Sequence, residues 1–279
     1  MKEWISPIPR KVHLIWIGDN PFPDYFNYFL KTFRENFSEF EIKIWGNNDL
    51  KRKNFPLTFD YIQVAKKLQG KHMIDTEGYK MFDKDMKPLT YSKWAQITDL
   101  MRLEIIYRYG GYYFDTTFEI LKPMYNLLNK KGVRFIGCNE IPRFKDVDIL
   151  SNSFFGATPG NPILKRLLSP KKLNGIDFYN IAVDFETGPG YLRSGIKSTD
   201  NYHIFPTKYF YPFVEEYSPG KDPMYRKASK NKCHSKKKTN KRIKGKGYLK
   251  FPCDKYPQSY ALKHWQLGKS WLISEYYTE

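Results

Sequence analysis

A helical run at residues 92–109 stops at two glycines and leads directly into a segment with the pattern of a strand. Ser92 is placed to cap the start of this helix, and Gly110 and Gly111 are placed to end it, because glycine readily adopts the left-handed conformation that terminates helices. Residues 112–121, YYFDTTFEIL, then predict a strand. The sequence therefore predicts an α/β fold rather than a helical bundle.

The rest of the chain repeats this alternation of strands and helices. A buried strand is predicted at 12–18, an amphipathic helix at 24–35 and a further strand at 41–45. Later segments predict strands at 133–138 and 153–157, and a short helix beginning near Pro162. Strands that alternate with helices favour a mostly parallel central sheet, and we expect one domain over residues 1–279.

Composition excludes several classes of protein. With 41% hydrophobic and 18% aromatic residues, the chain can bury enough apolar surface to fold. Its three cysteines, Cys138, Cys233 and Cys253, are too few and too widely spaced to predict a disulfide framework or a structural zinc site. Charges interrupt the first 18 residues, so no signal peptide is predicted there and we expect a cytoplasmic location.

The net charge of +18 is concentrated in one place. Many of the lysines and arginines lie between residues 226 and 250, in a low-complexity stretch that we interpret as part of a basic insertion at 221–250. Such an insertion fits a solvated loop, or a segment that docks on an anionic glycan, membrane or nucleic acid. An obligate nucleic-acid partner is not predicted.

Three polar positions in the predicted strand indicate the chemistry. Alternation along a strand places Asp115, Thr117 and Glu119 on one face. A carboxylate at the exit of a buried strand is suited to holding a divalent cation against a nucleotide diphosphate, although taken alone it also fits a turn. On the preceding helix, Asp99 and Arg102 are three residues apart and share a face, as functional partners or as a simple ion pair.

These residues, in this order, resemble glycosyltransferase family 32, whose members carry a DXD-type motif and are related to yeast outer-chain mannosyltransferases and large clostridial glucosylating toxins. The resemblance covers most of the chain, through the segments IPRKVHLIWIG, SNSFFGATPGNP, TGPGYLR, HIFPTKYFYP and SYALKHWQLGKSW. It implies a GT-A type fold. It also implies transfer of a hexose, with retention of configuration, from a UDP- or GDP-sugar to a glycan or other hydroxyl acceptor.

The resemblance also assigns roles to individual residues. It implies that Trp16 stacks on the donor base and that Asp99 and Arg102 bind the hydroxyls of the donor sugar. The remaining donor-binding positions that it implies are Tyr113, Asp115, Asn152, His264, Ser270 and Trp271. The implied metal set, for Mn²⁺ or Mg²⁺, is Asp115, Glu119, Thr117 and His264.

The sequence departs from the family at the metal motif. The second aspartate of the DXD motif, the direct metal ligand in the family, is replaced by Thr117, whose neutral hydroxyl is a poorer ligand for a divalent cation. Three interpretations stay open. Asp115, Glu119 and the diphosphate hold the ion; or the enzyme works without a metal, with Lys263 or Lys269 supplying positive charge; or the chain is an inactive binding or scaffold protein.

Overall fold

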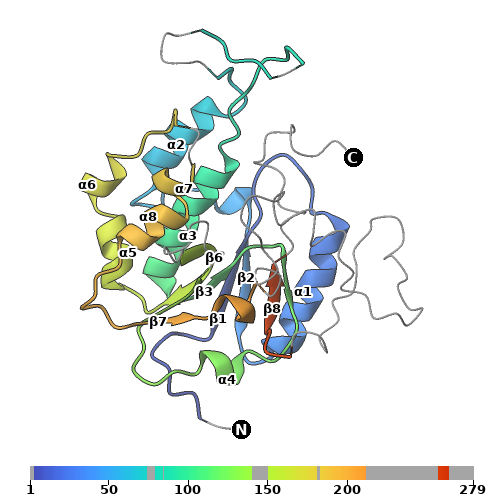
Figure 1. The fold of residues 1–279 in the computed structure, drawn as a ribbon, viewed down its shortest axis with the longest axis vertical. Helices are drawn as coiled ribbons and strands as arrows, with labels where there is room; N and C mark the ends of the chain where they lie inside the picture. The colour runs from blue at the N-terminus through green and yellow to red at the C-terminus, as the bar shows by residue number, and fades with distance from the viewer. Residues whose placement is uncertain are drawn as a thin grey trace, which may run out of the picture.

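The computed structural model describes residues 3–73, 79–83, 85–139, 150–180, 183–211 and 257–263. Its largest element is a six-stranded sheet, whose strands are β1 (Lys11–Ile15), β2 (Glu41–Trp45), β3 (Gly111–Phe114), β5 (Phe135–Asn139), β6 (Leu150–Ala157) and β7 (Tyr202–Phe205). They lie in the order β2-β1-β3-β6-β5-β7 (Figure 1). Strand β6 is antiparallel to both of its neighbours, and the other pairings are parallel. The predicted α/β fold with a mostly parallel sheet is confirmed.

Helices cover both faces of this sheet. One face carries α2 (Phe59–Leu68), α3 (Trp94–Tyr109), α5 (Pro162–Leu167), α6 (Pro170–Leu173), α7 (Val183–Glu186) and α8 (Pro189–Ser194), as Figure 1 shows. The other face carries α1 (Asp24–Asn36) and a two-stranded sheet of β4 (Phe118–Ile120) and β8 (Ala261–Lys263). Short connections form α4 (Tyr125–Leu128), η1 (Asn47–Asp49) and η2 (Thr207–Tyr209). Each face of the central sheet therefore has its own apolar core.

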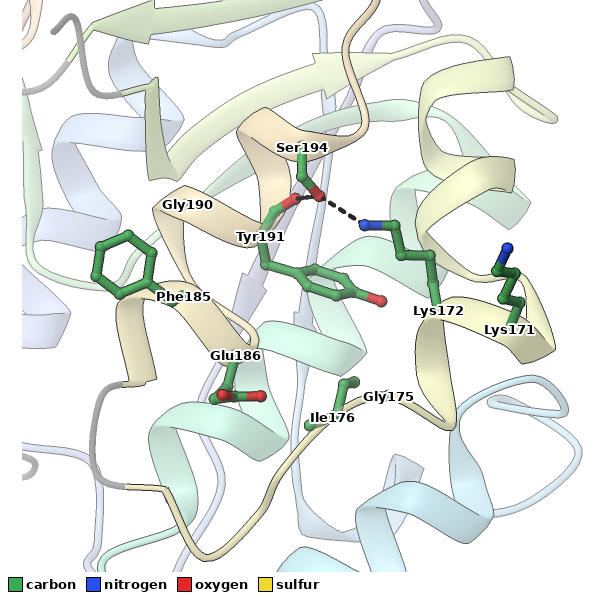
Figure 2. Close-up of a pocket in the computed structure, with 9 residues that line it drawn as sticks. All are labelled: Lys171, Lys172, Gly175, Ile176, Phe185, Glu186, Gly190, Tyr191 and Ser194. Atoms are coloured by element: carbon green, nitrogen blue, oxygen red, sulfur yellow. Dashed lines mark hydrogen bonds between the residues drawn. The ribbon is translucent and has the colours of Figure 1, made fainter.

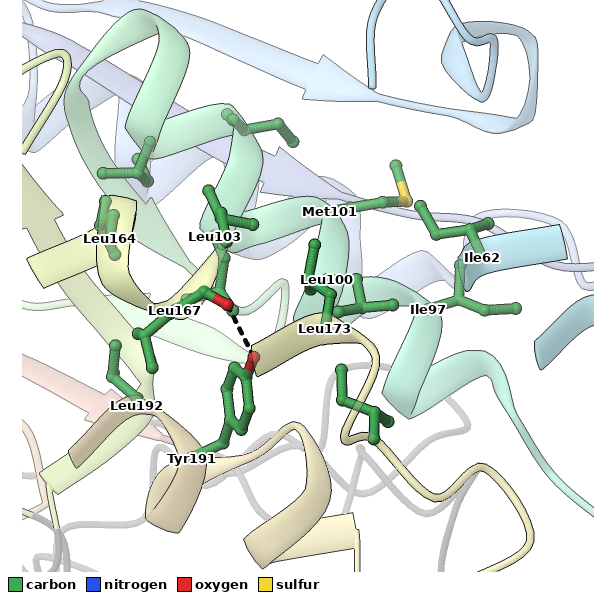
Figure 3. Close-up of a cluster of buried hydrophobic side chains, with 14 of the residues drawn as sticks. Ile62, Ile97, Leu100, Met101, Leu103, Leu164, Leu167, Leu173, Tyr191 and Leu192 are labelled. Atoms are coloured by element: carbon green, nitrogen blue, oxygen red, sulfur yellow. Dashed lines mark hydrogen bonds between the residues drawn. The ribbon is translucent and has the colours of Figure 1, made fainter. Parts of the chain in front are cut away.

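Helix α3 is the central element of the larger core. Its apolar side chains Ile97, Leu100, Met101 and Leu103 pack against α2, α5, α6 and α8 (Figure 3). Because α3 lies between the sheet and these helices, several of its polar side chains are buried as well. Buried polar groups are costly unless hydrogen-bonded, so the polar residues of α3 must find partners inside the fold.

The predicted ends of α3 are right at one terminus and wrong at the other. The helix stops at Gly110, whose φ of 64° is the left-handed conformation expected of a terminating glycine. It begins at Trp94 after Lys93, with no side-chain cap, so Ser92 does not have the predicted capping role.

The predicted strand at 112–121 is wrong as one continuous element. Strand β3 ends at Phe114, and the chain turns, with the amide of Phe118 donating to the carbonyl of Asp115 at 3.2 Å. Residues 118–120 then form β4 in the second sheet, where they pair with β8. Because a turn separates the two strands, the alternation that placed Asp115, Thr117 and Glu119 on one face does not hold.

Several predicted features lie outside the described residues. These are the basic insertion at 221–250, the two cysteines Cys233 and Cys253, for which no zinc site is predicted, and the site residues His264, Ser270 and Trp271. Within the described ranges, no helix has both the length and the apolar character needed to cross a bilayer.

A buried histidine in β1 makes stability depend on pH. His13 is 2% exposed, its Nε2 donates to the carbonyl of Gly110 at 3.0 Å, and its Nδ1 accepts from the indole of Trp45 at 3.2 Å. Those two bonds require the neutral ring, and burial lowers the pKa of His13 from 6.5 to about 4. Its contribution to stability is therefore complete above pH 6.5 and is lost as the pH falls through 4.

We expect the wild type to lose about 3 kcal/mol between pH 6.5 and 4 through this residue. The variant His13→Gln, which does not titrate there, should show a loss smaller by that amount. Urea unfolding of both proteins across this pH range measures the difference. Parallel pH profiles for the two proteins would show that His13 is not buried as a neutral ring.

Candidate functional site

The strand order marks one place in the sheet as a binding site. Strand β2 lies on one side of β1 and β3 lies on the other, so the order of the strands reverses between β1 and β3. Ligands of open α/β sheets bind at the carboxyl ends of the strands beside such a reversal. Trp16 follows β1 and Asp115 follows β3, and the two strands are parallel, so both residues lie at this edge.

Asp115 is held by three side chains from different parts of the chain. The hydroxyl of Tyr113 donates to its Oδ1 at 2.6 Å, and Nη1 of Arg102 lies 3.3 Å from the same oxygen. The ammonium of Lys263, on β8, forms an ion pair with Oδ2. Its own backbone amide donates to the carbonyl of Ser153 at 2.9 Å, which fixes the turn after β3. Both carboxylate oxygens are therefore engaged.

Arg102 links Asp115 to a second carboxylate. Its Nη2 lies 3.1 Å from Oδ1 of Asp99, its Nη1 donates to the carbonyl of Asn152 at 2.8 Å, and its guanidinium carbon lies 4.5 Å from the ring centre of Tyr113. Arginine's fixed fork of donors suits this combination of carboxylate, carbonyl and ring. The helical face predicted to carry Asp99 and Arg102 does carry both, and it is buried against the sheet.

Asp99 has two further partners. The side-chain amide of Asn152 donates to Oδ1 at 2.9 Å, and the hydroxyl of Thr187 donates to Oδ2 at 2.8 Å. We use the term polar cluster for the set Asp99, Arg102, Tyr113, Asp115, Asn152, Thr187 and Lys263. The structure thus brings together five of the predicted site residues.

Burial and charge shift the pKa values within the polar cluster in opposite directions. Burial raises the pKa of Asp115, but Lys263 and then Arg102 outweigh it and hold the pKa below its usual value. Burial raises the pKa of Asp99, with Arg102 and Thr187 acting against that rise. Burial likewise holds the pKa of Tyr113 well above its usual range, so its phenol keeps the proton that it donates to Asp115.

The described residues do not fit a divalent cation. A cation next to Asp115 would meet the like charges of Lys263 and Arg102. Thr117 offers one neutral hydroxyl in place of a carboxylate, and Mg²⁺ or Mn²⁺ prefers several oxygen ligands with negative charge. No group of three or more histidine, cysteine, aspartate or glutamate side chains in the described ranges is placed to hold an ion.

Glu119 does not join Asp115. Its carboxylate accepts from the hydroxyl of Tyr28 on α1 at 2.9 Å. In the pairing of β4 with β8, Glu119 is opposite Leu262 while Phe118 is opposite Lys263, so Glu119 and Lys263 point to opposite faces of this ribbon. The predicted pairing of Asp115 with Glu119 around one ion stays a prediction, and His264, the other predicted ligand, is not among the described residues.

Trp16 lies at the same edge with a partly exposed ring. The indole stacks near Phe26, with ring centres 6.2 Å apart and an interplanar angle of 27°, and lies 5.9 Å from Phe22. Its Nε1 donates to the carbonyl of Asn20 at 3.0 Å. These contacts fix the plane of the ring while leaving part of it accessible, which fits the stacking on a base that the resemblance implied.

Two polar side chains near the polar cluster have no hydrogen-bond partner in the described structure. Gln96, one turn before Asp99 on α3, is fully buried with both amide atoms unsatisfied, and the hydroxyl of Thr117 is buried in the same way. Unsatisfied buried groups are rare and call for a partner such as water or a ligand. Sequence reasoning did not single out Gln96 or Thr187, because a lone amide or hydroxyl has no distinguishing local pattern.

A hollow of about 400 Å³ lies apart from the polar cluster. It is lined by α6, α7 and α8, including Lys171, Phe185 and Tyr191 (Figure 2). Glu186, on its wall, immediately precedes Thr187, the partner of Asp99. The hollow contains none of the polar cluster residues, so it is not the site that the strand order and the buried charges mark.

The first part of the chain, which includes Trp16, Asp99 and Asp115, matches a known family model. Residues 1–134 match the family model described as "Glycosyltransferase sugar-binding region containing DXD motif". No curated protein matches the chain in sequence.

Solved structures with a similar fold include one that is described as a glycosyltransferase. The PaToxG glycosyltransferase has 14% identity and a TM-score of 0.44, over 67% of this chain and 68% of that one. The catalytic domain of alpha-toxin from Clostridium novyi has 10% identity and a TM-score of 0.39, over 67% and 72%. An active-site mutant of LgtC has 13% identity and a TM-score of 0.36, over 77% and 81%.

Proposed function

We propose that this chain transfers a hexose from a UDP- or GDP-sugar to a glycan or other hydroxyl acceptor, because residues 1–134 match a family model of a glycosyltransferase sugar-binding region. One observation carries the proposal. Asp115, at the reversal of strand order, is held by Arg102 and Tyr113 and lies at the same edge of the sheet as Trp16. This places a fixed carboxylate, a guanidinium and an aromatic ring where α/β folds bind nucleotides.

Each part of a nucleotide-sugar has a matching group in this arrangement. The ring of Trp16 offers an apolar surface for the base, and Asp115 offers acceptor oxygens for the ribose. Asp99 and Arg102 together offer acceptors and donors for sugar hydroxyls, in the pattern that the family resemblance implied. The α/β fold agrees with the GT-A type, and we propose retention of configuration by the same resemblance.

The buried charges of the polar cluster support a ligand-binding site. Burying charges is expensive, and replacing a buried ion pair by apolar residues is often neutral or stabilising. Asp99 at 4% exposure and Arg102 at 6% exposure are therefore a costly arrangement for a protein that needs only the fold. Binding of a polar ligand would account for these buried charges.

The proposed function predicts that a nucleotide-sugar stabilises the folded protein. A ligand that binds only the folded state raises the melting temperature by mass action. We expect at least one member of a panel of UDP- and GDP-hexoses to raise it, and to be slowly hydrolysed or transferred. Both assays are run with added Mn²⁺ and separately with a chelator, because glycosyltransferases with a DXD motif generally use a divalent metal.

In the same assay, Asp115→Asn should lower turnover of the donor by about 10² to 10³, the range seen when one electrostatic contact of an active site is removed. The matched control is Asp60→Asn, which removes an exposed carboxylate paired with Arg52. That control should keep wild-type turnover. A wild-type protein that neither binds nor consumes any donor, with or without metal, would leave the scaffold interpretation standing.

A further inference from the structure

We propose that Lys263 takes the place of the divalent cation at the DXD motif, so that the leaving diphosphate is stabilised by an ammonium group and the enzyme works without a metal. This inference rests on the proposed function. It concerns the source of the positive charge that stabilises the leaving diphosphate. The family match does not determine that source.

The second sheet delivers Lys263 to this position. Strand β8 pairs antiparallel with β4, and β4 begins immediately after the turn that carries Asp115 and Thr117. In this pairing, Lys263 lies opposite Phe118. The side chain crosses the ring of Phe118, with Nζ 5.4 Å from the ring centre, and its ammonium reaches Oδ2 of Asp115. Lys263 is only 6% exposed, so the fold holds this charge in place rather than leaving it in solvent.

The charges balance without a metal. In a motif with two aspartates, two negative charges meet a cation of charge +2. Here the second carboxylate is replaced by Thr117, which leaves the single negative charge of Asp115 to meet the single positive charge of Lys263. Loss of one carboxylate and gain of one ammonium add two positive charges, which equals the charge of the cation that they replace.

The chemistry requires positive charge at this point. During transfer, the bond between the anomeric carbon and the diphosphate oxygen breaks with its electron pair on that oxygen. The acceptor hydroxyl oxygen forms the new bond to the anomeric carbon, and its proton passes to the departing diphosphate. A charge fixed beforehand in a site of low dielectric is an effective way to stabilise the developing negative charge. An ammonium has three donors, so Lys263 can keep Asp115 and still donate to diphosphate oxygens.

The first test uses the wild-type protein alone. Turnover of the donor found in the panel, measured in excess chelator, should equal turnover with added Mn²⁺ within a factor of about two. Calorimetry should detect no stoichiometric binding of Mn²⁺ to the protein alone. Turnover that disappears in chelator and returns with Mn²⁺ would overturn the proposal while leaving the glycosyltransferase function intact.

The second test removes the ammonium. In chelator, Lys263→Ala should turn over the donor about 10² to 10³ times more slowly, and the removal of its positive charge should let added Mn²⁺ restore part of the rate. Lys263→Arg keeps the charge and should stay within about tenfold of the wild type. The control Lys122→Ala removes another lysine that contacts the C-terminal segment, at the carbonyl of Pro257, and should not change turnover.

The variants also give outcomes that count against the proposal. Full activity of Lys263→Ala in chelator would overturn it. If Lys263→Ala does not fold, the proposal is still tested by Lys263→Arg and by the wild type in chelator. A wild type that loses its activity in chelator, together with an equal loss in Lys263→Arg, would contradict a role for the charge of Lys263. If the wild type consumes no donor under any condition, the proposed function fails first and for a separate reason.

Discussion

Replacing Arg102 with methionine is expected to lower the free energy of unfolding by about 3 to 5 kcal/mol, because it removes the cation shared by the buried carboxylate of Asp99 and the half-buried carboxylate of Asp115. Arg102 lies 3.1 Å from Asp99 and 3.3 Å from Asp115. Without it, the negative charges of these two residues repel each other in a region of low dielectric, and the carbonyl of Asn152 loses its donor. Methionine keeps much of the length of the side chain, so lost packing contributes little.

Urea unfolding measures this change, and Arg108→Met is the matched control. Arg108 lies on the same helix but contacts the carbonyls of Lys53 and Asn54 near the surface. We expect the control to lose about 1 kcal/mol or less. The Arg102→Met loss should be largest above pH 7 and should shrink as the pH falls below 7, because burial raises the pKa of Asp99 to about 7 and a protonated Asp99 no longer repels Asp115. A loss under 1 kcal/mol above pH 7 would mean that the buried network is not formed.

The second large effect is expected at Glu104, on the opposite side of α3 from the site. Its Oε1 accepts from the amide of Leu57 at 2.9 Å, and its Oε2 accepts from the amide and the hydroxyl of Thr58 at 2.8 and 2.6 Å. Thr58 is the residue just before α2, so a fully buried carboxylate on α3 fixes the start of the neighbouring helix.

Glu104→Ala should therefore cost about 3 to 5 kcal/mol, because it leaves several buried donors without an acceptor and also opens a cavity. Denaturant unfolding checks the value, with Glu35→Ala as the control. Glu35 is exposed on α1 and lies 3.8 Å from Lys31, so its loss should cost at most a few tenths of a kcal/mol. Similar losses in both variants would contradict the role assigned to Glu104.

The local elements of the fold were predictable because their signals are local. The segment EIKIW forms β2 with the predicted bounds, and the apolar spacing of residues 24–35 forms α1, one residue longer. Gly110 ends α3 as predicted, since the need for a positive φ is visible in the residue itself. The shared face of Asp99 and Arg102 followed from helical spacing alone.

What the sequence could not show depends on contacts between distant segments. The turn at Asp115 depends on the bond from its amide to Ser153, and the pairing of β4 with β8 draws residues 118–120 out of the central sheet. Strand propensity and the alternation of side chains are properties of one local segment, so they predicted a single strand where the structure has β3 and β4. Lys263 could be named from the sequence as a source of positive charge. Its contact with Asp115, which lies 148 positions earlier in the chain, could not be predicted.

The division of residues 111–120 between two sheets also separates the two sheets in the order of synthesis. The central sheet is built from segments ending at Phe205, whereas the ion pair of Asp115 needs a strand that begins at Ala261. The strands of the central sheet are therefore synthesised before the ammonium partner of Asp115. The polar cluster is complete only when β8 has paired with β4.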